Sequence, residues 1–266
     1  MEGNIHRLPI LRSYKDKQKL MEDVLVRESS ITIFYNRKRI ATLVCTPIEI
    51  MELAVGFLFS EGILSHFEEI KWISEDPRRR IVMVEGCVEN KTQDPLERVI
   101  VSGCGKASFL FPFEDQWEDE ISIEELSLPS HWISQLIREF CKRSKLYFAT
   151  GGVHSCALAN EEGIIIFSED IGRHNALDKV AGKCIMEGIE TKDSIILTTG
   201  RVSAEMVLKA RRMNPTFLIS RGAPTDLAVA LSKKAGITLI GFCRGERMNI
   251  YSRPERVIFK ENGEAT

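Results

Sequence analysis

The segment "IIIFSEDIGRHNALDKV", residues 164–180, joins an apolar run to an amphipathic run through a polar turn. Residues 164–167 are typical of a short strand, and the chain from Asn175 onwards places Leu177 and its apolar neighbours at helical spacing. A strand that passes through a glycine, here Gly172, into a helix is typical of α/β proteins. The segment therefore predicts a sheet with helices packed on it.

The same alternation continues towards the C-terminus. It predicts strands at residues 194–198, 216–219 and 237–242, helices at 175–187, 203–213 and 224–235, and an extended stretch at 248–251. Short links between these elements indicate a parallel sheet. We therefore expect an α/β fold in the second half of the chain.

Polar side chains gather where each predicted strand ends. The four exits, residues 168–175, 199–203, 220–225 and 243–247, each hold a glycine, an arginine and hydroxyl or carboxylate groups. The carboxyl ends of such strands share one edge, which is where ligands bind, and three exits lead into helix N-termini, which favour anions. Arginine matches phosphate oxygens with a planar fork. One Gly-Arg pair alone usually marks a tight turn, but the repetition predicts a cleft for a polyphosphate or dinucleotide, faced by Arg173, Arg201, Arg221, Arg244 and Arg247. Asp170 is expected to cap the next helix or to pair with Arg173, and the role of His174 stays open.

The first half of the chain has a different pattern. Residues 30–45 alternate about Asn36 as a β-hairpin does, and residues 46–49, Thr-Pro-Ile-Glu, predict a capping box that starts a helix. Residues 81–86 are typical of a strand, and the acidic residues 114–125 of a solvated connector. A helix is expected from Pro129-Ser130, with a core-facing stripe made by Trp132, Ile133, Leu136, Ile137, Phe140 and Cys141. We therefore predict a mixed N-terminal part over residues 1–145 and an α/β part over residues 146–266, α+β overall.

Bulk composition narrows the classes of function. The 266 residues are 44% hydrophobic and 28% charged, with a net charge of −2, so no global field favours nucleic acid or an acidic membrane. Seven cysteines, an odd number without a repeated pair, argue against a disulfide framework and favour the cytoplasm. Neither a signal peptide nor an apolar stretch long enough to span a bilayer is seen.

One cysteine has unusual neighbours. In "VSGCGKAS", residues 101–108, Cys104 stands between two glycines and two positions before Lys106. The glycines remove cover from the thiol, and the lysine favours its thiolate form, the nucleophile. Such a group suits the acceptance and transfer of an atom, whereas an incidental turn cysteine is the alternative. The other six cysteines have apolar or bulky neighbours and are expected to pack as small hydrophobic residues.

Zinc is a weaker alternative. His154 and Cys156 offer two ligand types, but the chain has neither a Cys-x-x-Cys pair nor the zinc deaminase signature. We therefore expect no structural metal.

Several motifs together resemble one family. "EDIGRHNALDKVAG" at residues 169–182 is similar to the hallmark of the formate dehydrogenase accessory sulfurtransferases, the FdhD family. "TGGVHSCAL", "TTGRVSAEM", "SRGAPTDLA" and "GFCRGERMNIY" resemble further blocks of that family, in the same order, between about residues 30 and 258.

The resemblance implies a cytoplasmic sulfur carrier. It implies that Cys104 takes persulfide sulfur from a cysteine desulfurase and transfers it to the molybdenum cofactor, bis-molybdopterin guanine dinucleotide, before insertion into formate dehydrogenase. It further implies a three-layer fold like that of cytidine deaminases and a homodimer. By position, the segment that holds the cofactor is Phe242, Cys243, Arg244, Gly245, Glu246 and Arg247.

The chain departs from many relatives at one position. Where they have Cys-Gly-x-Cys, this chain has Ala107 in place of the second cysteine. A persulfide can form on Cys104 alone, because exchange needs one nucleophile, and Cys243 could assist. Two alternatives stay open: a cofactor chaperone without sulfur transfer, and a deaminase-like nucleotide-modifying enzyme, which would need a metal-activated water.

Overall fold

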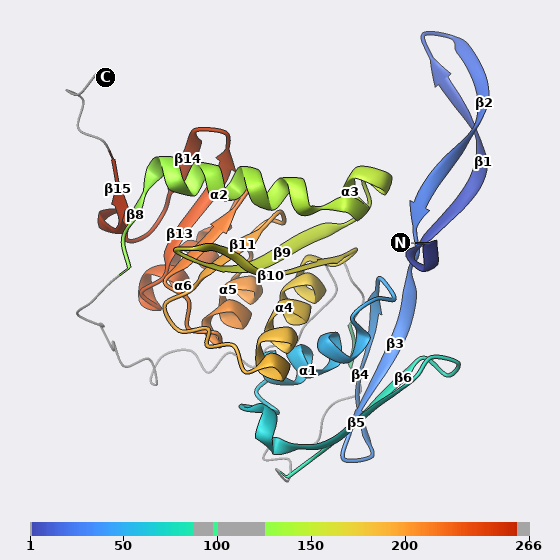
Figure 1. The fold of residues 1–266 in the computed structure, drawn as a ribbon, viewed down its shortest axis with the longest axis horizontal. Coiled ribbons are helices and arrows are strands. Elements are labelled where there is room, and N and C mark those ends of the chain that lie inside the picture. The colour runs from blue at the N-terminus through green and yellow to red at the C-terminus, as the bar shows by residue number, and fades with distance from the viewer. Residues whose placement is uncertain (1, 88–97, 101–125, 260–266) are drawn as a thin grey trace.

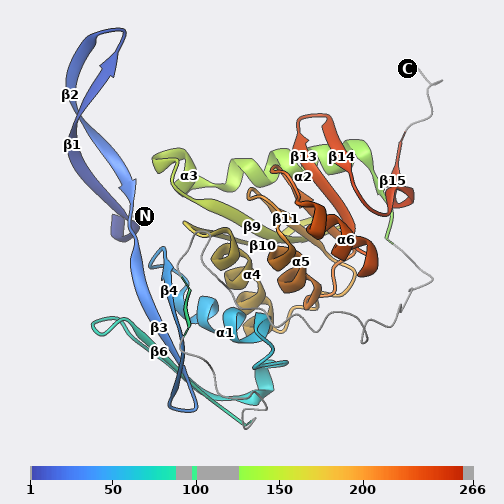
Figure 2. The same cartoon turned by 180° about the vertical axis from the view of Figure 1, so that it is seen from behind.

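The computed structural model describes residues 2–87, 98–100 and 126–259, which form a ribbon and two larger sheets (Figures 1 and 2). Cys104, Ala107 and the acidic residues 114–125 lie outside these ranges. After a 3₁₀ turn at Glu2–Asn4, β1 (Ile5–Tyr14) and β2 (Lys17–Val26) form a two-stranded antiparallel ribbon that projects from the rest of the molecule (Figure 1).

The N-terminal half builds a five-stranded mixed sheet. Its strands, in spatial order, are β5 (Ile70–Asp76), β6 (Ile81–Gly86), β3 (Ser29–Tyr35), β4 (Lys38–Cys45) and β7 (Arg98–Ile100), with a 3₁₀ turn at Phe67–Glu69 before β5. The predicted hairpin at residues 30–45 is confirmed. Its turn residues Asn36 and Arg37 have φ angles of 47° and 64°, which tight hairpin turns require. One face of the sheet packs against α1 (Ile50–Ser60).

The start of α1 differs from the prediction. The expected capping box is wrong, because the helix begins at Ile50 after Glu49, which has a left-handed φ of 53°. Thr46 instead bonds to a distant part of the chain. Its N–H donates to Asp170 Oδ2 at 3.0 Å, and its hydroxyl accepts from the N–H of Ile171 at 3.1 Å. Thr46, in the N-terminal half, is therefore hydrogen-bonded to the end of β10 and the residue after it in the C-terminal half.

The C-terminal half builds a six-stranded sheet. Its strands, in spatial order, are β10 (Gly163–Asp170), β9 (His154–Asn160), β11 (Ile195–Thr198), β12 (Phe217–Ser220), β13 (Thr238–Arg244) and β14 (Arg247–Ile250). The expected parallel order holds only for β11, β12 and β13. β9, which the sequence pattern did not predict, lies between β10 and β11 and is antiparallel to both. Because two antiparallel steps restore the direction, β10 still ends at the same edge as β11, β12 and β13.

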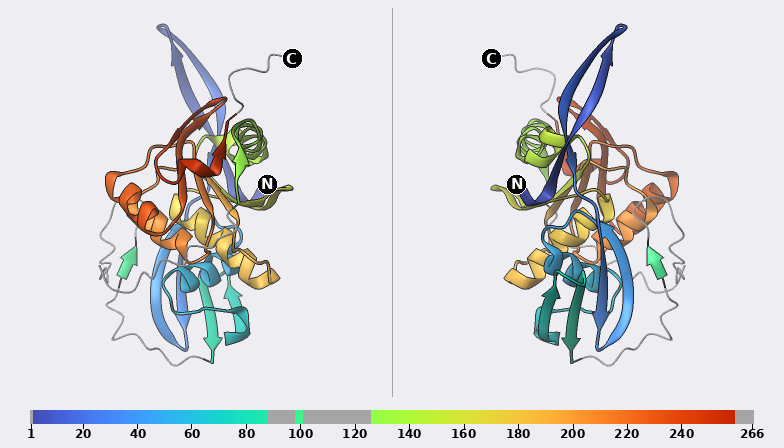
Figure 3. Two further views of the ribbon diagram at one scale, coloured as in Figure 1. Left: turned by 90° about the vertical axis from the view of Figure 1, so that its left-hand side faces the viewer. Right: turned by 90° about the vertical axis from the view of Figure 1, so that its right-hand side faces the viewer.

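Helices cover both faces of this sheet, so the second half has three layers (Figure 3). α4 (Arg173–Glu187), α5 (Ala204–Arg211) and α6 (Asp226–Lys234) pack on one face, and α2 (Ser130–Arg143) packs on the other. Successive strand residues alternate between the two: Ile196 faces the first group, whereas Ile195 and Leu197 face α2. The short strands β8 (Leu128–Pro129) and β15 (Val257–Ile258) pair beside α2, after a 3₁₀ turn at Pro254–Arg256.

The two halves meet where α1 crosses α4. A Cβ at Gly56 would lie 1.7 Å from the carbonyl oxygen of Asp178, and one at Gly182 would lie 1.8 Å from that of Glu52. Neither position can hold a side chain at this separation, so the glycines allow the helix backbones to approach closely.

Two buried ion pairs lie at this crossing. Lys179 Nζ lies 2.7 Å from Asp170 Oδ2, and both side chains are fully buried. Lys209 Nζ lies 2.9 Å from Asp178 Oδ2, and the hydroxyl of Ser60 on α1 donates to Asp178 at 2.6 Å. Such groups are tolerated in a core only when they are paired and hydrogen-bonded. We call this region the α1–α4 joint, comprising Gly56, Ser60, Asp170, Asp178, Lys179, Gly182 and Lys209.

The predicted division at residue 145 stays a prediction. α2 belongs to residues 1–145 in that division, but it packs on the six-stranded sheet. None of the helices in the described ranges is long and apolar enough to cross a bilayer.

Candidate functional site

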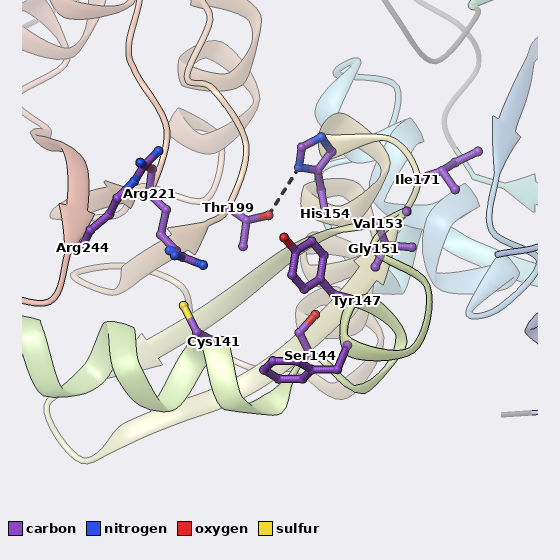
Figure 4. A pocket seen from close by; sticks show the side chains of 12 residues that line it. Cys141, Ser144, Tyr147, Gly151, Val153, His154, Ile171, Thr199, Arg221 and Arg244 are labelled. Atoms are coloured by element: carbon purple, nitrogen blue, oxygen red, sulfur yellow. Dashed lines mark hydrogen bonds between the residues drawn. The ribbon is translucent and has the colours of Figure 1, made fainter. Parts of the chain in front are cut away.

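A pocket of about 590 Å³ opens at the edge of the six-stranded sheet where β11, β12 and β13 end and β9 begins (Figure 4). The end of α2 and α3 (Lys145–Thr150) form its other wall. Its lining residues are Cys141, Ser144, Tyr147, Phe148, Gly151, Gly152, Val153, His154, Ile171, Thr199, Arg221 and Arg244. The volume falls within the roughly 300–1,000 Å³ typical of small-molecule sites.

Two arginines supply positive charge to the pocket. Arg221 follows β12, and Arg244 is the last residue of β13. Arg244 Nε donates to the carbonyl oxygen of Arg221 at 3.2 Å, which ties the two strand ends together and leaves the guanidinium nitrogens Nη1 and Nη2 of Arg244 available to a ligand. Figure 4 shows both side chains on the wall opposite Tyr147. A pair of guanidinium groups in a concave site suits phosphate oxygens.

A neutral histidine lies across the pocket. His154 Nδ1 is 3.4 Å from the hydroxyl of Thr199, which also accepts from the N–H of Ser155 at 3.0 Å. Burial lowers the pKa of His154 below its usual range, and the positive charges of Arg173 and Arg201 lower it further. The imidazole is therefore a hydrogen-bonding group at neutral pH rather than an additional cation.

Aromatic rings form the remaining wall. Tyr147 is 48% exposed and Phe148 is 70% exposed, and their rings meet edge to face at 6.3 Å. Exposed rings beside a pocket offer flat surfaces on which a nucleobase can stack. The carboxylate of Glu169 holds the start of α3, because it accepts from the N–H groups of Leu146 and Tyr147 at 3.3 and 3.4 Å and from the hydroxyl of Ser144.

Comparison of the sequence with known protein families gives one clear match. The sequence model of the FdhD/NarQ family matches residues 26–258. The chain belongs to the FdhD/NarQ family. The resemblance inferred from the motifs is therefore confirmed.

Individual FdhD/NarQ relatives cover nearly the whole chain. A protein of Bacillus subtilis (strain 168) named sulfur carrier protein FdhD is 37% identical over 240 residues, which are 89% of this chain and 91% of that protein. A Bacillus pumilus (strain SAFR-032) protein of the same name is 34% identical over 260 residues, 97% and 99% of the two chains. A crystal structure from Desulfotalea psychrophila, described provisionally as a formate dehydrogenase accessory protein, matches with a TM-score of 0.77 and 27% identity, covering 96% of this chain and 100% of that one.

The five arginines that were expected to face one cleft do not all line the pocket. Arg221 and Arg244 do, and Arg173 and Arg201 lie close enough to His154 to lower its pKa. Arg247 is exposed on β14, with its guanidinium 5.8 Å from the ring of Phe242, and is not a lining residue.

The rest of the expected cofactor segment plays several structural roles. Gly245 forms the turn between β13 and β14 with a φ of 62°, and Glu246 lies 3.8 Å from Arg138 on the surface. Cys243 is fully buried between the sheet and α2, and burial raises the pKa of its thiol to about 11. Of residues 242–247, Arg244 is the one that lines the described pocket. That these residues bind a cofactor stays a prediction.

Two expectations concern the strand exits and the helices that follow them. Asp170 pairs with the buried Lys179 inside the α1–α4 joint, and its Oδ1 also accepts from the N–H of Gly172, the residue before α4, at 2.8 Å. The helix N-termini were expected to form the anion site, yet the pocket lining holds no residue from the first turn of α5 or α6. Loop residues and strand ends line it instead. His174 is partly buried, with Nε2 3.5 Å from the carboxylate of Glu205.

The cysteines divide as expected, with two exceptions. Cys45, Cys156, Cys184 and Cys243 are buried, whereas Cys87 is exposed. Cys141 was expected to lie in the core, but it is only partly buried and lines the pocket. Burial raises the pKa of its thiol, an effect that the nearby Arg221 opposes.

The sequence pattern missed the aromatic wall. Tyr147 and Phe148 stand just before Gly151-Gly152, and the exposure of two adjacent rings cannot be read from their order in the chain.

Within the described residues, no three His, Cys, Asp or Glu side chains form a metal-binding group.

Proposed function

We propose that this chain is a sulfur carrier that serves formate dehydrogenase. It takes persulfide sulfur from a cysteine desulfurase on Cys104 and passes it to the molybdenum of bis-molybdopterin guanine dinucleotide before that cofactor enters the dehydrogenase. The work takes place in the cytoplasm, and the carrier acts as a homodimer. The names of the relatives, sulfur carrier and formate dehydrogenase accessory protein, support the general role.

The pocket is the observation that supports the finer proposal. The cofactor is here the substrate, and its nucleotide ends combine a purine base with a pyrophosphate. Arg221 and Arg244 match the phosphate oxygens, and Tyr147 offers a stacking face for the base across the same pocket. His154, being neutral, can bond to a ring nitrogen or to a hydroxyl.

Each step of the sulfur transfer uses a single thiolate, so Cys104 can act without a second loop cysteine. The thiolate of Cys104 attacks the outer sulfur of the desulfurase persulfide, a new S–S bond forms, and the desulfurase cysteine leaves as a thiolate. The S–S bond of the Cys104 persulfide then breaks, the Cys104 thiolate leaves with the bonding pair, and the outer sulfur bonds to the molybdenum of the substrate, which must arrive reduced because it supplies the two electrons of the new bond. Holding the nucleotide in a fixed pocket lowers the cost of bringing the acceptor to this group.

Radioactive sulfur tests the carrier role. The protein is treated with a desulfurase and ³⁵S-cysteine, and protein-bound label is measured for the wild type and for Cys104→Ala. We expect the variant to lose the label and its host strain to lose formate dehydrogenase activity, while GDP binding is unchanged. Label and activity that survive the substitution would contradict the transfer step.

Ala107 favours a second candidate, a cofactor chaperone without sulfur transfer, because the second thiol found in many relatives is missing. In that case Cys104→Ala keeps formate dehydrogenase activity, whereas loss of Arg221 and Arg244 abolishes it. Cys104→Ala therefore separates the two candidates, because loss of Arg221 and Arg244 abolishes activity in both.

A further inference from the structure

His154 and Thr199 face the pocket from two neighbouring strand ends. His154 is the first residue of β9, and Thr199 directly follows β11. The two strands are antiparallel and pair Thr198 with Cys156, so Thr199 and Ser155 form the next pair, at the edge of the sheet. The N–H of Thr199 donates to the carbonyl oxygen of Ser155 at 3.1 Å. The strand pairing therefore fixes the Thr199 hydroxyl beside the imidazole of His154.

The hydrogen bonds of the Thr199 hydroxyl determine the state of that imidazole. Its oxygen accepts from the N–H of Ser155 at 3.0 Å. Among the described residues, the one acceptor near its hydrogen is His154 Nδ1, at 3.4 Å. A ring nitrogen accepts a hydrogen bond only when it carries no hydrogen. Nδ1 of His154 is therefore the bare nitrogen.

The other ring nitrogen of His154 then carries the hydrogen. The ring is neutral, because burial and then the charges of Arg173 and Arg201 lower its pKa, and a neutral imidazole has a single N–H. That hydrogen is on Nε2, which has no hydrogen-bond partner among the described residues and is not closed off from solvent. His154 therefore presents a fixed donor to the pocket that it lines.

The neighbouring histidine, His174, has no such access to a ligand. Its Nε2 is fully buried, makes no hydrogen bond to the described residues, and lies 3.5 Å from the carboxylate of Glu205. His174 does not line the pocket. Of these two imidazoles, His154 is the one that can contact a bound molecule.

His154 lies on the same side of the pocket as Tyr147. The N–H of Tyr147 is held by Glu169, which pairs with Ser155, the neighbour of His154 in β9. The two pocket arginines come from the ends of β12 and β13, further along the sheet, and Figure 4 shows them across the open space. A base stacked on Tyr147 therefore lies nearer to the Nε2 donor than phosphates bound by the arginines.

The two purine bases present opposite groups to such a donor. Guanine has a keto oxygen, which accepts a hydrogen bond, where adenine has an amine, which donates one. A fixed N–H matches the oxygen and meets a second donor in adenine. A site built to make one hydrogen bond rejects an analogue that leaves its polar group unpaired.

We propose that His154 selects guanine by donating from Nε2 to the keto oxygen of the base, and that Thr199 is the positioning residue that keeps the hydrogen on Nε2. The inference rests on the proposed function, in which the pocket holds a guanine nucleotide, and adds the residue that recognises the base. Because Arg221 and Arg244 bind the phosphates, recognition of the base and binding of the phosphates can be measured separately.

Nitrogen NMR of the full chain, labelled with ¹⁵N-histidine, tests the tautomer. Bare and protonated ring nitrogens give separate signals, and the signals of His154 are those lost in His154→Ala. At neutral pH we expect a bare Nδ1 and a protonated Nε2 in the wild type and in Thr199→Ser, which keeps the hydroxyl, and a mixture of tautomers in Thr199→Val. A protonated Nδ1 in the wild type, or an unchanged tautomer in Thr199→Val, would overturn the assignment.

Calorimetric titration with three nucleotides tests the recognition. GDP and IDP, which has the keto oxygen of guanine but lacks its amine, should both bind the wild type about tenfold more tightly than ADP. His154→Ala should weaken GDP and IDP binding about tenfold and leave ADP and pyrophosphate binding unchanged. His131→Gln, an exposed site at the end of α2 far from the pocket, should bind every ligand as the wild type does.

The outcomes distinguish this inference from the proposed function. A wild type that binds no GDP would overturn both. GDP binding that His154→Ala leaves unchanged, or an equal loss for GDP and ADP, would overturn the role of His154 alone. IDP that binds as weakly as ADP would do the same, because the amine of guanine would then be the group that is recognised.

Discussion

The α1–α4 joint and the pocket use the same kinds of residue for opposite purposes. The joint contains Asp170 and Lys179 fully buried, with their charges paired. The pocket holds Arg221 partly exposed and Arg244 exposed, both facing open space. Both regions take residues from strand exits that look alike in sequence. Burial, which the order of residues does not show, decides whether a charge supports the fold or is offered to a ligand.

The motif at residues 169–182 illustrates this division. Asp170, Lys179 and Gly182 hold the two halves together, and Glu169 holds α3, which carries the aromatic wall. Arg173 lies near enough to affect His154 at the pocket. Most of this hallmark therefore positions the site rather than forming it.

The largest effect is expected when a joint charge is left without its partner. Lys179→Met removes the cation beside Asp170 and should lower the free energy of unfolding by about 3–5 kcal/mol, the usual result of breaking a buried pair. Urea unfolding measures this. Lys192→Met, at an exposed position, should stay within about 0.5 kcal/mol of the wild type. If Lys179→Met and Lys192→Met lower the free energy of unfolding equally, the buried charges of the joint do not support the fold as we describe.

A smaller effect follows from a histidine beside the joint. Burial, followed by the charges of Arg173 and Lys209, lowers the pKa of His174 to about 3. As pH falls below the usual histidine range, the unfolded chain binds this proton before the folded one does, so stability is full above about pH 6.5 and is lost towards pH 3.

His174→Gln should remove that sensitivity. Between pH 7 and pH 5 the wild type should lose about 1–2 kcal/mol more than the variant in its free energy of unfolding. The comparison is made in a Glu205→Gln background, because Glu205, whose pKa is raised by burial, lies 3.5 Å from His174 Nε2 and its titration would otherwise change with the substitution. Parallel stability curves for the two proteins would show that His174 is not held neutral.

Much of the architecture could be predicted from hydrophobic periodicity. Strands β10 to β13, their intervening helices and the hairpin at Asn36 follow the expected pattern, and Arg221 and Arg244 meet where their strand exits predicted. β9 was missed because His154–Asn160 alternates weakly and is buried on both faces. Thr46 was misread because its hydroxyl bonds to a partner more than a hundred residues away, which no local rule contains.

The aromatic wall shows a second limit. Tyr147 and Phe148 line the pocket only because Glu169, on another strand, holds the short helix that carries them. A local pattern cannot predict that contact. The carrier role of Cys104 rests on the sequence and the family, since that residue lies outside the described ranges.

Calorimetric titration with GDP, a chemical fragment of the proposed substrate, tests most directly whether the pocket holds its nucleotide end. We predict that the wild type binds GDP and that Arg221→Ala/Arg244→Ala weakens binding roughly tenfold to hundredfold, because charge-assisted hydrogen bonds worth about 1.5–3 kcal/mol are lost. Arg247→Ala, outside the pocket lining, should bind as the wild type does. Undiminished binding by the double variant, or a loss confined to Arg247→Ala, would contradict the account.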